Sequence, residues 1–316
     1  MDSSMIADRR RLRRKVGFWR VVAVALLLAL ALAFYGFLFA DNANRRPHVA
    51  HVTISGLITD DTELLERLDK IKDEDAVKAL VVSISSPGGT TYGGERIFKA
   101  IRAIAAKKPV VSDVRTLAAS AGYMIATAGD TIIAGDSSIT GSIGVIFQYP
   151  QVKPLLDKIG VSMEEIKSSP LKAEPSPFHP ASEEAKAMIN NMIVDSYAWF
   201  VDLVADRRKL PREDVLKLAD GTIFTGRQAL KAKLIDQLGG DDEIRAYLAT
   251  KNVSKDLPEI DWNKKSSTPF LLAGAASQIL TLLGYGDLAK AQDLTGILPQ
   301  KLLLDGLVSV WQVGHD

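Results

Sequence analysis

The sequence predicts an α/β fold in which repeated β-α units build a mostly parallel sheet, preceded by one N-terminal transmembrane helix. From Val49 onward, short apolar runs alternate with amphipathic segments of helical period, a rhythm typical of a parallel sheet with helices packed on it. Before that point, Val21 to Ala40 form a stretch of twenty residues without a charge. With 316 residues, of which 47% are hydrophobic and 24% charged, the chain is long enough for one large core or two smaller ones.

The N-terminal region predicts a membrane anchor. An uncharged stretch of about 20 residues matches a helix that crosses a hydrocarbon core of roughly 30 Å. Residues 1–20 carry seven Lys and Arg, which predicts a cytoplasmic N-terminus with the body of the chain on the other side. A cleaved signal peptide is the alternative, but its apolar region usually has about 7 to 15 residues and ends in small residues, unlike Phe37-Leu38-Phe39-Ala40. We therefore predict a cytoplasmic segment at 1–20, an uncleaved transmembrane helix at 21–40 and a linker at 41–48.

Charge and residue types exclude several classes of function. Seven basic against two acidic residues give residues 1–20 a charge of +5, which leaves −4 for the rest out of a total of +1, so the folded part lacks the positive charge that nucleic-acid binding requires. There are no cysteines, which excludes disulfides, thiolate metal sites and a cysteine nucleophile. We expect no metal and no cofactor, because the histidines show no metal-ligand spacing and are expected at the surface or in linkers: His48, His51, His179 and His315.

Between Val49 and Leu248 the elements follow one another as β-α units. From apolar runs, strands are predicted at 51–56, 78–84, 109–114, 131–134 and 143–146. Helices are predicted at 62–71, at 93–106 and at 121–128. The segment 167–180 holds four prolines and is predicted to be an extended loop, and Ser182 can cap the long helix that follows it. That helix carries Met and aromatic residues on one face, which is typical of core or subunit contact. A helix opened by Pro211 and elements at 220–229 and 236–248 close the domain, which we assign to residues 49–250.

After Thr250 the pattern weakens, and residues 251–316 are predicted to form a C-terminal extension. The apolar stretch 269–283 is interrupted by Gly274 and is too short for a second membrane helix. A further apolar patch covers 302–313. The sequence leaves open whether these stretches pack on a neighbouring subunit or on the membrane surface.

Ser86-Pro87-Gly88-Gly89 follows directly on the buried strand at 78–84. Glycine lets backbone N–H groups come close to a ligand and adopts positive φ, which suits an oxyanion hole. The carboxyl end of a parallel strand is also where open α/β sheets carry their sites. Taken alone, the same residues are equally typical of an ordinary turn.

Ser120 begins the helix predicted at 121–128. There its hydroxyl lies beside free N–H groups and the positive end of the helix dipole, which favour a developing oxyanion. Serine is also a leading N-cap residue, so a purely structural role is the alternative. The run Thr140-Gly141-Ser142-Ile143-Gly144 follows and, taken alone, is typical of a turn before a strand.

The order and spacing of the short segments around Gly88, Ser120, Ser142 and Lys172 resemble those of the bacterial signal peptide peptidases of the SppA type, which are membrane-anchored Ser/Lys proteases. Ala119-Ser120-Ala121-Gly122-Tyr123 resembles the segment that carries the nucleophile and departs only by Ala121 for glycine, while Thr140 to Gly144 is intact. Ile166-Lys167-Ser168-Ser169-Pro170-Leu171-Lys172 resembles the segment that carries the base. The resemblance covers roughly Val49 to Leu248. It implies the Clp/crotonase-like α/β fold, with residues 49–250 as the protease domain.

The resemblance assigns a role to each candidate site residue. Ser120 is the nucleophile, Lys172 is the general base, and Ser142 holds the lysine amine toward Ser120 by a hydrogen bond. The amides expected to form the oxyanion hole are those of Gly88, Gly89 and Ala121. A lysine acts as a base only after its ammonium loses a proton, so we expect Lys172 to be buried against apolar groups. Only the resemblance separates Lys172 from Lys167.

By resemblance, the chain is a membrane-anchored serine endopeptidase that degrades remnant signal peptides and other apolar peptides. Its expected location is the bacterial inner membrane, with the bilayer bound through residues 21–40 and the catalytic domain periplasmic or extracytoplasmic. Chains with one catalytic unit form dyads where subunits meet. A ring-shaped homo-oligomer is therefore expected, in which Lys172 serves its own Ser120 or that of a neighbour.

Three alternatives stand beside this interpretation. A relative of the same protease could cut one specific membrane protein, such as a stomatin-type partner, and the sequence does not separate the two. A catalytically silent module would keep the fold for assembly, but the intact Ser120, Ser142 and Lys172 argue against it. A crotonase-type acyl-CoA enzyme shares the oxyanion chemistry, yet it would be cytosolic and commonly uses carboxylates, so the predicted anchor disfavours it.

Overall fold

This computed structural model describes residues 17–28, 30–31, 46–263 and 307–310 of the protein. The chain divides into two compact units, residues 1–48 and 49–316. In the first unit, residues 17–28 are helical. Among the described residues, no helix combines the length and the apolar character that crossing a bilayer requires. Residue 29 and residues 32–40 of the predicted transmembrane helix lie outside the described residues.

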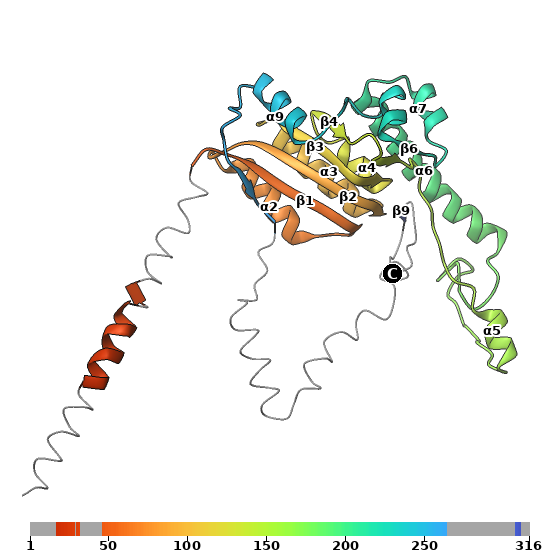
Figure 1. Cartoon of the computed structure of the whole chain (residues 1–316). Helices are drawn as coiled ribbons and strands as arrows, with labels where there is room; N and C mark the ends of the chain where they lie inside the picture. The colour runs from red at the N-terminus through yellow and green to blue at the C-terminus, as the bar shows by residue number, and fades with distance from the viewer. Residues whose placement is uncertain (1–16, 29, 32–45, 264–306, 311–316) are drawn as a thin grey trace, which may run out of the picture. The chain divides into compact units, whose positions relative to one another are not determined.

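One sheet organises the second unit, and its order among the described strands is β6-β5-β3-β2-β1-β8 (Figure 1). β4 also pairs with β3 and β7, while β9 pairs with β2. The pairings are parallel except those of β5 with β6 and of β2 with β9, which confirms the predicted α/β class with a mostly parallel sheet. The strands are β1 (His48–Ile58), β2 (Val77–Thr90), β3 (Val110–Ala119), β4 (Thr131–Ala134), β5 (Ile139–Gly141), β6 (Ile223–Thr225), β7 (Gln237–Leu238), β8 (Glu259–Asp261) and β9 (Val308–Val310).

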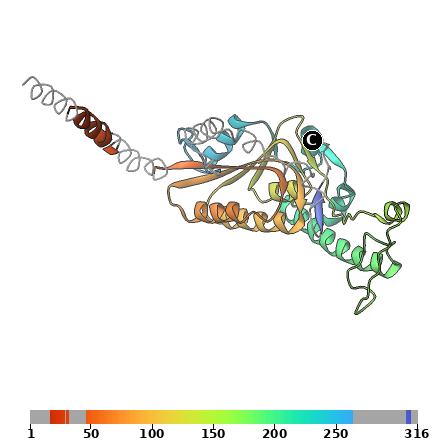
Figure 2. The same ribbon diagram turned by 90° about the horizontal axis from the view of Figure 1, so that it is seen from below.

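Helices cover both faces of this sheet, as Figure 2 shows. Along β2, Leu80 and Val82 enter a core shared with α2 and α3, whereas Ala79 and Val81 enter a second core under α9. This alternation follows from the period of two in a strand, and each large side chain buried this way contributes about 1.5–3 kcal/mol. The helices are α2 (Thr62–Asp73), α3 (Thr91–Ala105), α4 (Ala121–Ala126), α5 (Lys153–Lys158), α6 (Glu183–Arg208), α7 (Arg212–Leu218), α8 (Gly226–Lys231) and α9 (Asp241–Thr250).

Side-chain caps set where the main helices begin. Asp61 accepts a hydrogen bond from the Leu64 N–H at 2.9 Å and so starts α2. Thr90 does the same for α3, immediately after β2 ends. Ser182 accepts from the Ala185 N–H at 3.1 Å, which confirms the predicted cap of α6. Each cap satisfies an N–H group that the first helical turn leaves without an acceptor.

The strand predicted at 143–146 is wrong. The strand in this region is β5, and the chain turns directly after it because Gly141 and Ser142 have φ angles of +93° and +50°. Those angles belong to the left-handed region, which ends extended structure. Of the predicted strand, Ile146 forms an isolated bridge with Val308. Two short strands, β8 and β9, come from residues beyond Thr250.

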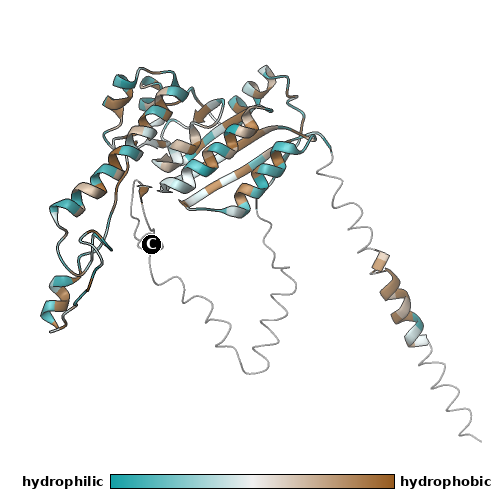
Figure 3. Cartoon of the chain, turned by 180° about the vertical axis from the view of Figure 1, so that it is seen from behind, coloured by the Kyte–Doolittle hydropathy of each residue, from teal (hydrophilic) through white to brown (hydrophobic). Residues whose placement is uncertain are grey.

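The segment 147–193, which we call the arm, leaves the sheet and returns to it through α5, a long loop and the first half of α6 (Figures 1 and 3). The predicted loop at 167–180 lies within it and forms no helix or strand. The arm exposes large apolar side chains, namely Leu155, Ile159, Val161, Met163, Ile166 and Met192. An apolar surface of this kind is typical of a contact with another molecule.

Candidate active site

Ser120 occupies the sharp junction between β3 and α4. Its φ and ψ of 58° and −119° lie outside the helical and extended regions, and its N–H donates to the Gly141 carbonyl at 2.8 Å. Although it stands at the N-cap position, its hydroxyl makes no capping hydrogen bond, so the structural alternative fails. A serine held in a rare conformation with a hydroxyl that caps nothing is typical of a nucleophile.

The three amides predicted for the oxyanion hole have different surroundings. The Gly88 N–H donates to the Ser86 hydroxyl at 3.1 Å, so it is already engaged. Ala121 opens α4, and its N–H has no acceptor within the helix. Gly89 lies so close to β1 that a Cβ would stand 1.9 Å from the Ile58 carbonyl oxygen. Ala121 is therefore the candidate that local structure supports for stabilising an oxyanion, while the role of the Gly89 amide, opposite Ser309 in the β2–β9 pairing, stays a prediction.

A short segment of the chain's own C-terminal region lies in the site as strand β9. It runs antiparallel to the end of β2, with Ser309 directly opposite Gly89. On its other side, Val308 and Ile146 exchange backbone hydrogen bonds of 2.9 and 3.1 Å. An extended segment is thus held between two pieces of backbone, which is how an added strand binds a sheet edge.

The Ser309 side chain meets the candidate nucleophile. Its hydroxyl is hydrogen-bonded to the Ser120 hydroxyl and donates to the Gly144 carbonyl at 2.8 Å. Because a hydroxyl carries one proton, Ser120 is the donor between the two serines. None of the expectations drawn from the sequence includes this contact. The signal available was the apolar patch at 302–313, in which Val308 and Val310 flank a serine.

A cavity of about 320 Å³ opens beside Ser120 and Ser142. Its other lining is mainly apolar and includes Ile143, Val145, Ile146, Ile193 and Tyr197. Ser142 lies in a left-handed conformation, with its N–H bound to the Thr222 carbonyl at 2.8 Å. Among the described residues its hydroxyl has no partner. The structure therefore brings Ser120 and Ser142 together beside a space that suits an apolar side chain.

The two lysines of the segment 166–172 differ in a way that the sequence did not reveal. Lys167 Nζ lies 2.6 Å from Glu174 and 3.2 Å from Glu165, and its hydrogen bond to Glu174 raises its pKa. Lys172 is exposed, and its ammonium has no partner among the described residues. Lys167 is therefore committed to ion pairs and is the poorer base.

The expected burial of Lys172 is absent from the single chain. It sits on the loop of the arm, and it does not line the cavity that Ser120 and Ser142 share. Completing a Ser/Lys dyad thus requires a lysine that comes from elsewhere or an arm that moves.

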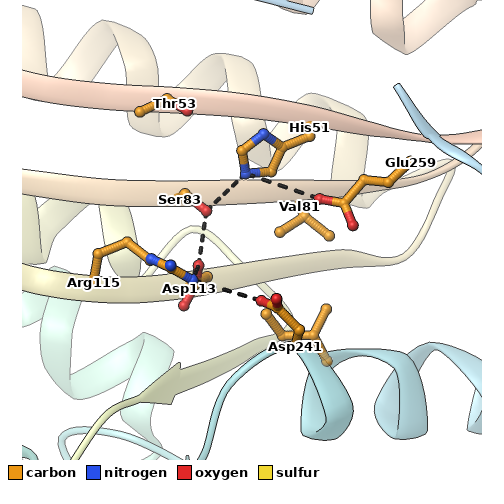
Figure 4. A pocket seen from close by; sticks show the side chains of 9 residues that line it. His51, Thr53, Val81, Ser83, Asp113, Arg115, Asp241 and Glu259 are labelled. Atoms are coloured by element: carbon orange, nitrogen blue, oxygen red, sulfur yellow. Dashed lines mark hydrogen bonds and ion pairs between the residues drawn. The ribbon is translucent and has the colours of Figure 1, made fainter. Parts of the chain in front are cut away.

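A second cavity, of about 380 Å³, lies on the sheet face near α9 (Figure 4). His51 Nε2 lies 2.8 Å from the Ser83 hydroxyl, and that hydroxyl donates to Asp113 at 2.7 Å. Since the serine proton goes to the aspartate, the histidine must donate to the serine and does not act as its base. These three residues therefore do not form a nucleophilic triad. The prediction that His48 lies at the surface or in a linker is wrong, because it belongs to β1 and is fully buried, whereas His51 is partly exposed in the strand predicted at 51–56.

Comparison with known proteins identifies the relatives of this chain. Residues 102–254 match the model of peptidase family S49, and residues 41–134 match that of Clp protease. "Putative protease slr0021" of Synechocystis sp. is 36% identical over 242 residues, which are 75% of this chain and 87% of that protein. "Putative signal peptide peptidase SppA" of Enterococcus faecium is 32% identical, over 73% of this chain and 71% of that protein.

Two further comparisons differ in how much they cover. "Protease 4" of Salmonella typhi is 34% identical over 69% of this chain, but the match spans only 37% of that longer protein. Among solved structures, a variant of the 1510-N membrane-bound stomatin-specific protease matches 70% of this chain with a TM-score of 0.45 at 16% identity. A likeness at that level has no bearing on the substrate.

Proposed function

Because the chain belongs to peptidase family S49 and is a serine endopeptidase, we propose that it is anchored in a membrane and degrades remnant signal peptides and other apolar peptides. One observation carries the proposal. A peptide segment, β9, lies extended along Gly88 to Thr90 with its central serine on the Ser120 hydroxyl. A substrate that takes the same place would bring its backbone to Ser120 as an added strand.

The proposed reaction uses Ser120 as nucleophile and Lys172 as base. The Ser120 oxygen attacks the scissile carbonyl carbon while its proton passes to the neutral Lys172 amine. The resulting oxyanion is stabilised by the N–H groups of Gly89 and Ala121. The lysine then gives the proton to the leaving amine, and water hydrolyses the acyl-enzyme by the reverse proton path.

We propose that Lys172 reaches the Ser120 of a neighbouring copy in a homo-oligomeric ring. Lys172 is exposed on the arm and free of partners among the described residues, and the arm around it exposes apolar side chains. The Ser142 hydroxyl lies beside Ser120, has no partner in the part of the chain that the structure describes, and offers a hydrogen bond to an incoming amine. Docking of one arm on another copy would bury the apolar surface and desolvate the lysine, which favours loss of its proton.

The preference for apolar peptides rests on the cavity beside Ser120. Its lining by aliphatic side chains and Tyr197 favours an apolar substrate residue over a charged one.

Residues 21–40 are proposed to anchor the protein, with the catalytic unit on the periplasmic or extracytoplasmic side. Nucleic acid is not a proposed partner, since the chain beyond residue 20 is net acidic.

Mixing two inactive variants tests this function. The full-length protein, Ser120→Ala and Lys172→Ala would each be purified in detergent and assayed on an apolar signal-peptide-like substrate. We expect each variant alone to be inactive, and subunit exchange between them to restore part of the activity, because a mixed interface joins an intact Ser120 to an intact Lys172. Full activity of Lys172→Ala would remove the lysine from the mechanism. If both variants are inactive and mixing them restores no activity, the proposal of a dyad shared between subunits is wrong.

A further inference from the structure

We propose that the ion pair between Lys167 and Glu174 positions the general base, because it closes the loop that carries Lys172. The inference rests on the proposed role of Lys172. Lys167 and Glu174 lie seven positions apart in the chain, and Lys172 lies between them. Their charged atoms meet at 2.6 Å. Lys167 and Glu174 are thus positioning residues that do not touch the substrate.

Burial makes this pair different from the other ion pairs of the arm. The Glu174 side chain is only 6% exposed and that of Lys167 is 19% exposed. By contrast, Lys153 and Asp157 on α5 form a pair of 2.8 Å whose side chains are 45% and 57% exposed. Exposed pairs hold geometry weakly, whereas a pair shielded from water has to remain paired.

Glu174 is also the centre of a wider network. Its carboxylate accepts the Ser176 N–H at 3.2 Å and lies 3.3 Å from His179 Nε2. His179 in turn lies 2.7 Å from Glu165, which closes the ring back to Lys167. The network ties the segments before and after Lys172 to one another. It leaves the lysine itself as the unpaired cation of the loop among the described residues.

The backbone around Lys172 is tightly turned. The Lys172 N–H donates to the Ser169 carbonyl at 3.1 Å, and the Glu174 N–H donates to the Leu171 carbonyl at 3.4 Å. Ala173 has a φ of +61°, which an alanine adopts only where its surroundings enforce it. The ion pair spans this turn and supplies such a constraint.

The pair also controls the charge next to the base. Lys167 lowers the pKa of Glu174, so the carboxylate is ionised two residues from Lys172. While the carboxylate is paired with Lys167, the positive charge of the ammonium balances its negative charge. Without Lys167, it would be free to hold the Lys172 ammonium and so keep the base protonated to higher pH. The pair therefore affects both where the base lies and when it can accept a proton.

Removing Lys167 tests this inference in the full-length protein. We expect Lys167→Met to lower kcat about tenfold to a hundredfold with little change in KM, since small misplacement of a reacting group has effects of this size. We also expect the rising limb of its pH–rate profile to move to higher pH. Lys167→Arg should restore most of the rate, because it keeps the pair with Glu174. Lys153→Met removes an exposed cation from the same arm and should leave rate and profile unchanged.

A charge exchange and Lys172→Ala separate the possible outcomes. Lys167→Glu combined with Glu174→Lys should be more active than either single change, even where a single variant fails to fold or assemble. The positioning role is wrong if Lys167→Met has the same rate and pH–rate profile as Lys153→Met. It is also wrong if the double variant with exchanged charges is no more active than either single variant. Activity in Lys172→Ala would instead overturn the proposed function itself. An inactive Lys172→Ala beside a normal Lys167→Met would overturn the positioning role alone.

Discussion

The hydroxyl of Ser120 donates a hydrogen bond to the hydroxyl of Ser309, although 189 positions separate the two residues. The strand that carries Ser309 pairs with the same glycine segment that is expected to bind a substrate. The chain therefore places one of its own segments on its candidate nucleophile. Under the proposed mechanism, a peptide substrate would have to displace that segment before the hydroxyl could react.

We expect removal of residues 307–316 to improve substrate binding. A tethered strand competes at a high effective concentration, so KM should fall by about threefold or more in the shortened chain. The measurement is steady-state hydrolysis of an apolar peptide by both proteins. Ser309→Ala keeps the strand and loses only the hydroxyl contact, so its effect should be smaller. An unchanged KM in the shortened protein would show that β9 does not compete with substrate.

Gly89→Ala should destabilise the protein and abolish hydrolysis. The added Cβ would lie 1.9 Å from the Ile58 carbonyl oxygen, so β1 and β2 have to separate. Forcing an atom into packed structure costs about 1–3 kcal/mol, measurable by denaturant unfolding. Gly144→Ala is the matched control, because a Cβ there meets nothing within 4 Å. Equal stability of the two variants would contradict the close approach at Gly89.

Ile193→Ser should weaken the preference for apolar substrates. Ile193 comes from α6 and lines the cavity beside Ser120. Losing an aliphatic wall should lower kcat/KM about tenfold for a peptide with leucine at the cleavage site, and much less for one with alanine. Leu230→Ser serves as the control, because Leu230 is a partly exposed residue of α8 that does not line this cavity. A parallel loss for both peptides would place the binding of the substrate side chain elsewhere.

The arm should be more ordered in mild acid than in mild base. The carbonyl of Pro180 and the carboxylate of Glu165 raise the pKa of His179 above its usual value. Because the pKa is higher in the folded state, the protonated His179 stabilises the structure. This stabilisation is fully present below about pH 6.5 and is lost as the pH rises through the raised pKa. The pKa values of Glu165 and Glu174 are lowered, so these groups titrate below this range.

Limited proteolysis of the arm measures this dependence. Cleavage should be slower at about pH 6 than at about pH 8, once corrected for the pH dependence of the added protease. His179→Gln should remove the difference, whereas His51→Gln, on β1, should keep it. A difference that persists in His179→Gln would assign the effect to another group.

Much of the fold and part of the site follow from local sequence. Short apolar runs predicted β1 and β2, and isoleucines at helical spacing predicted α3, because a buried strand and the buried face of a helix both require apolar side chains. The resemblance of short motifs selected Ser120 and Ser142, and both line one cavity. The strand at 143–146 was predicted wrongly, since the left-handed turn at Gly141 and Ser142 leaves no signal in an apolar pattern.

Only the tertiary structure decided what those residues meet. Local sequence separates neither Lys167 from Lys172 nor Ser309 from any other serine. The difference between the lysines arises from Glu165 and Glu174, which both pair with the Lys167 ammonium, whereas the Lys172 ammonium has no partner within the described ranges. The strand at Val308–Val310 is defined by its antiparallel pairing with the end of β2, residues more than 200 positions earlier in the chain. Contacts of this kind depend on which strand edges and charged groups the folded chain brings together. The positions of helices and strands depend instead on the spacing of apolar residues in the local sequence.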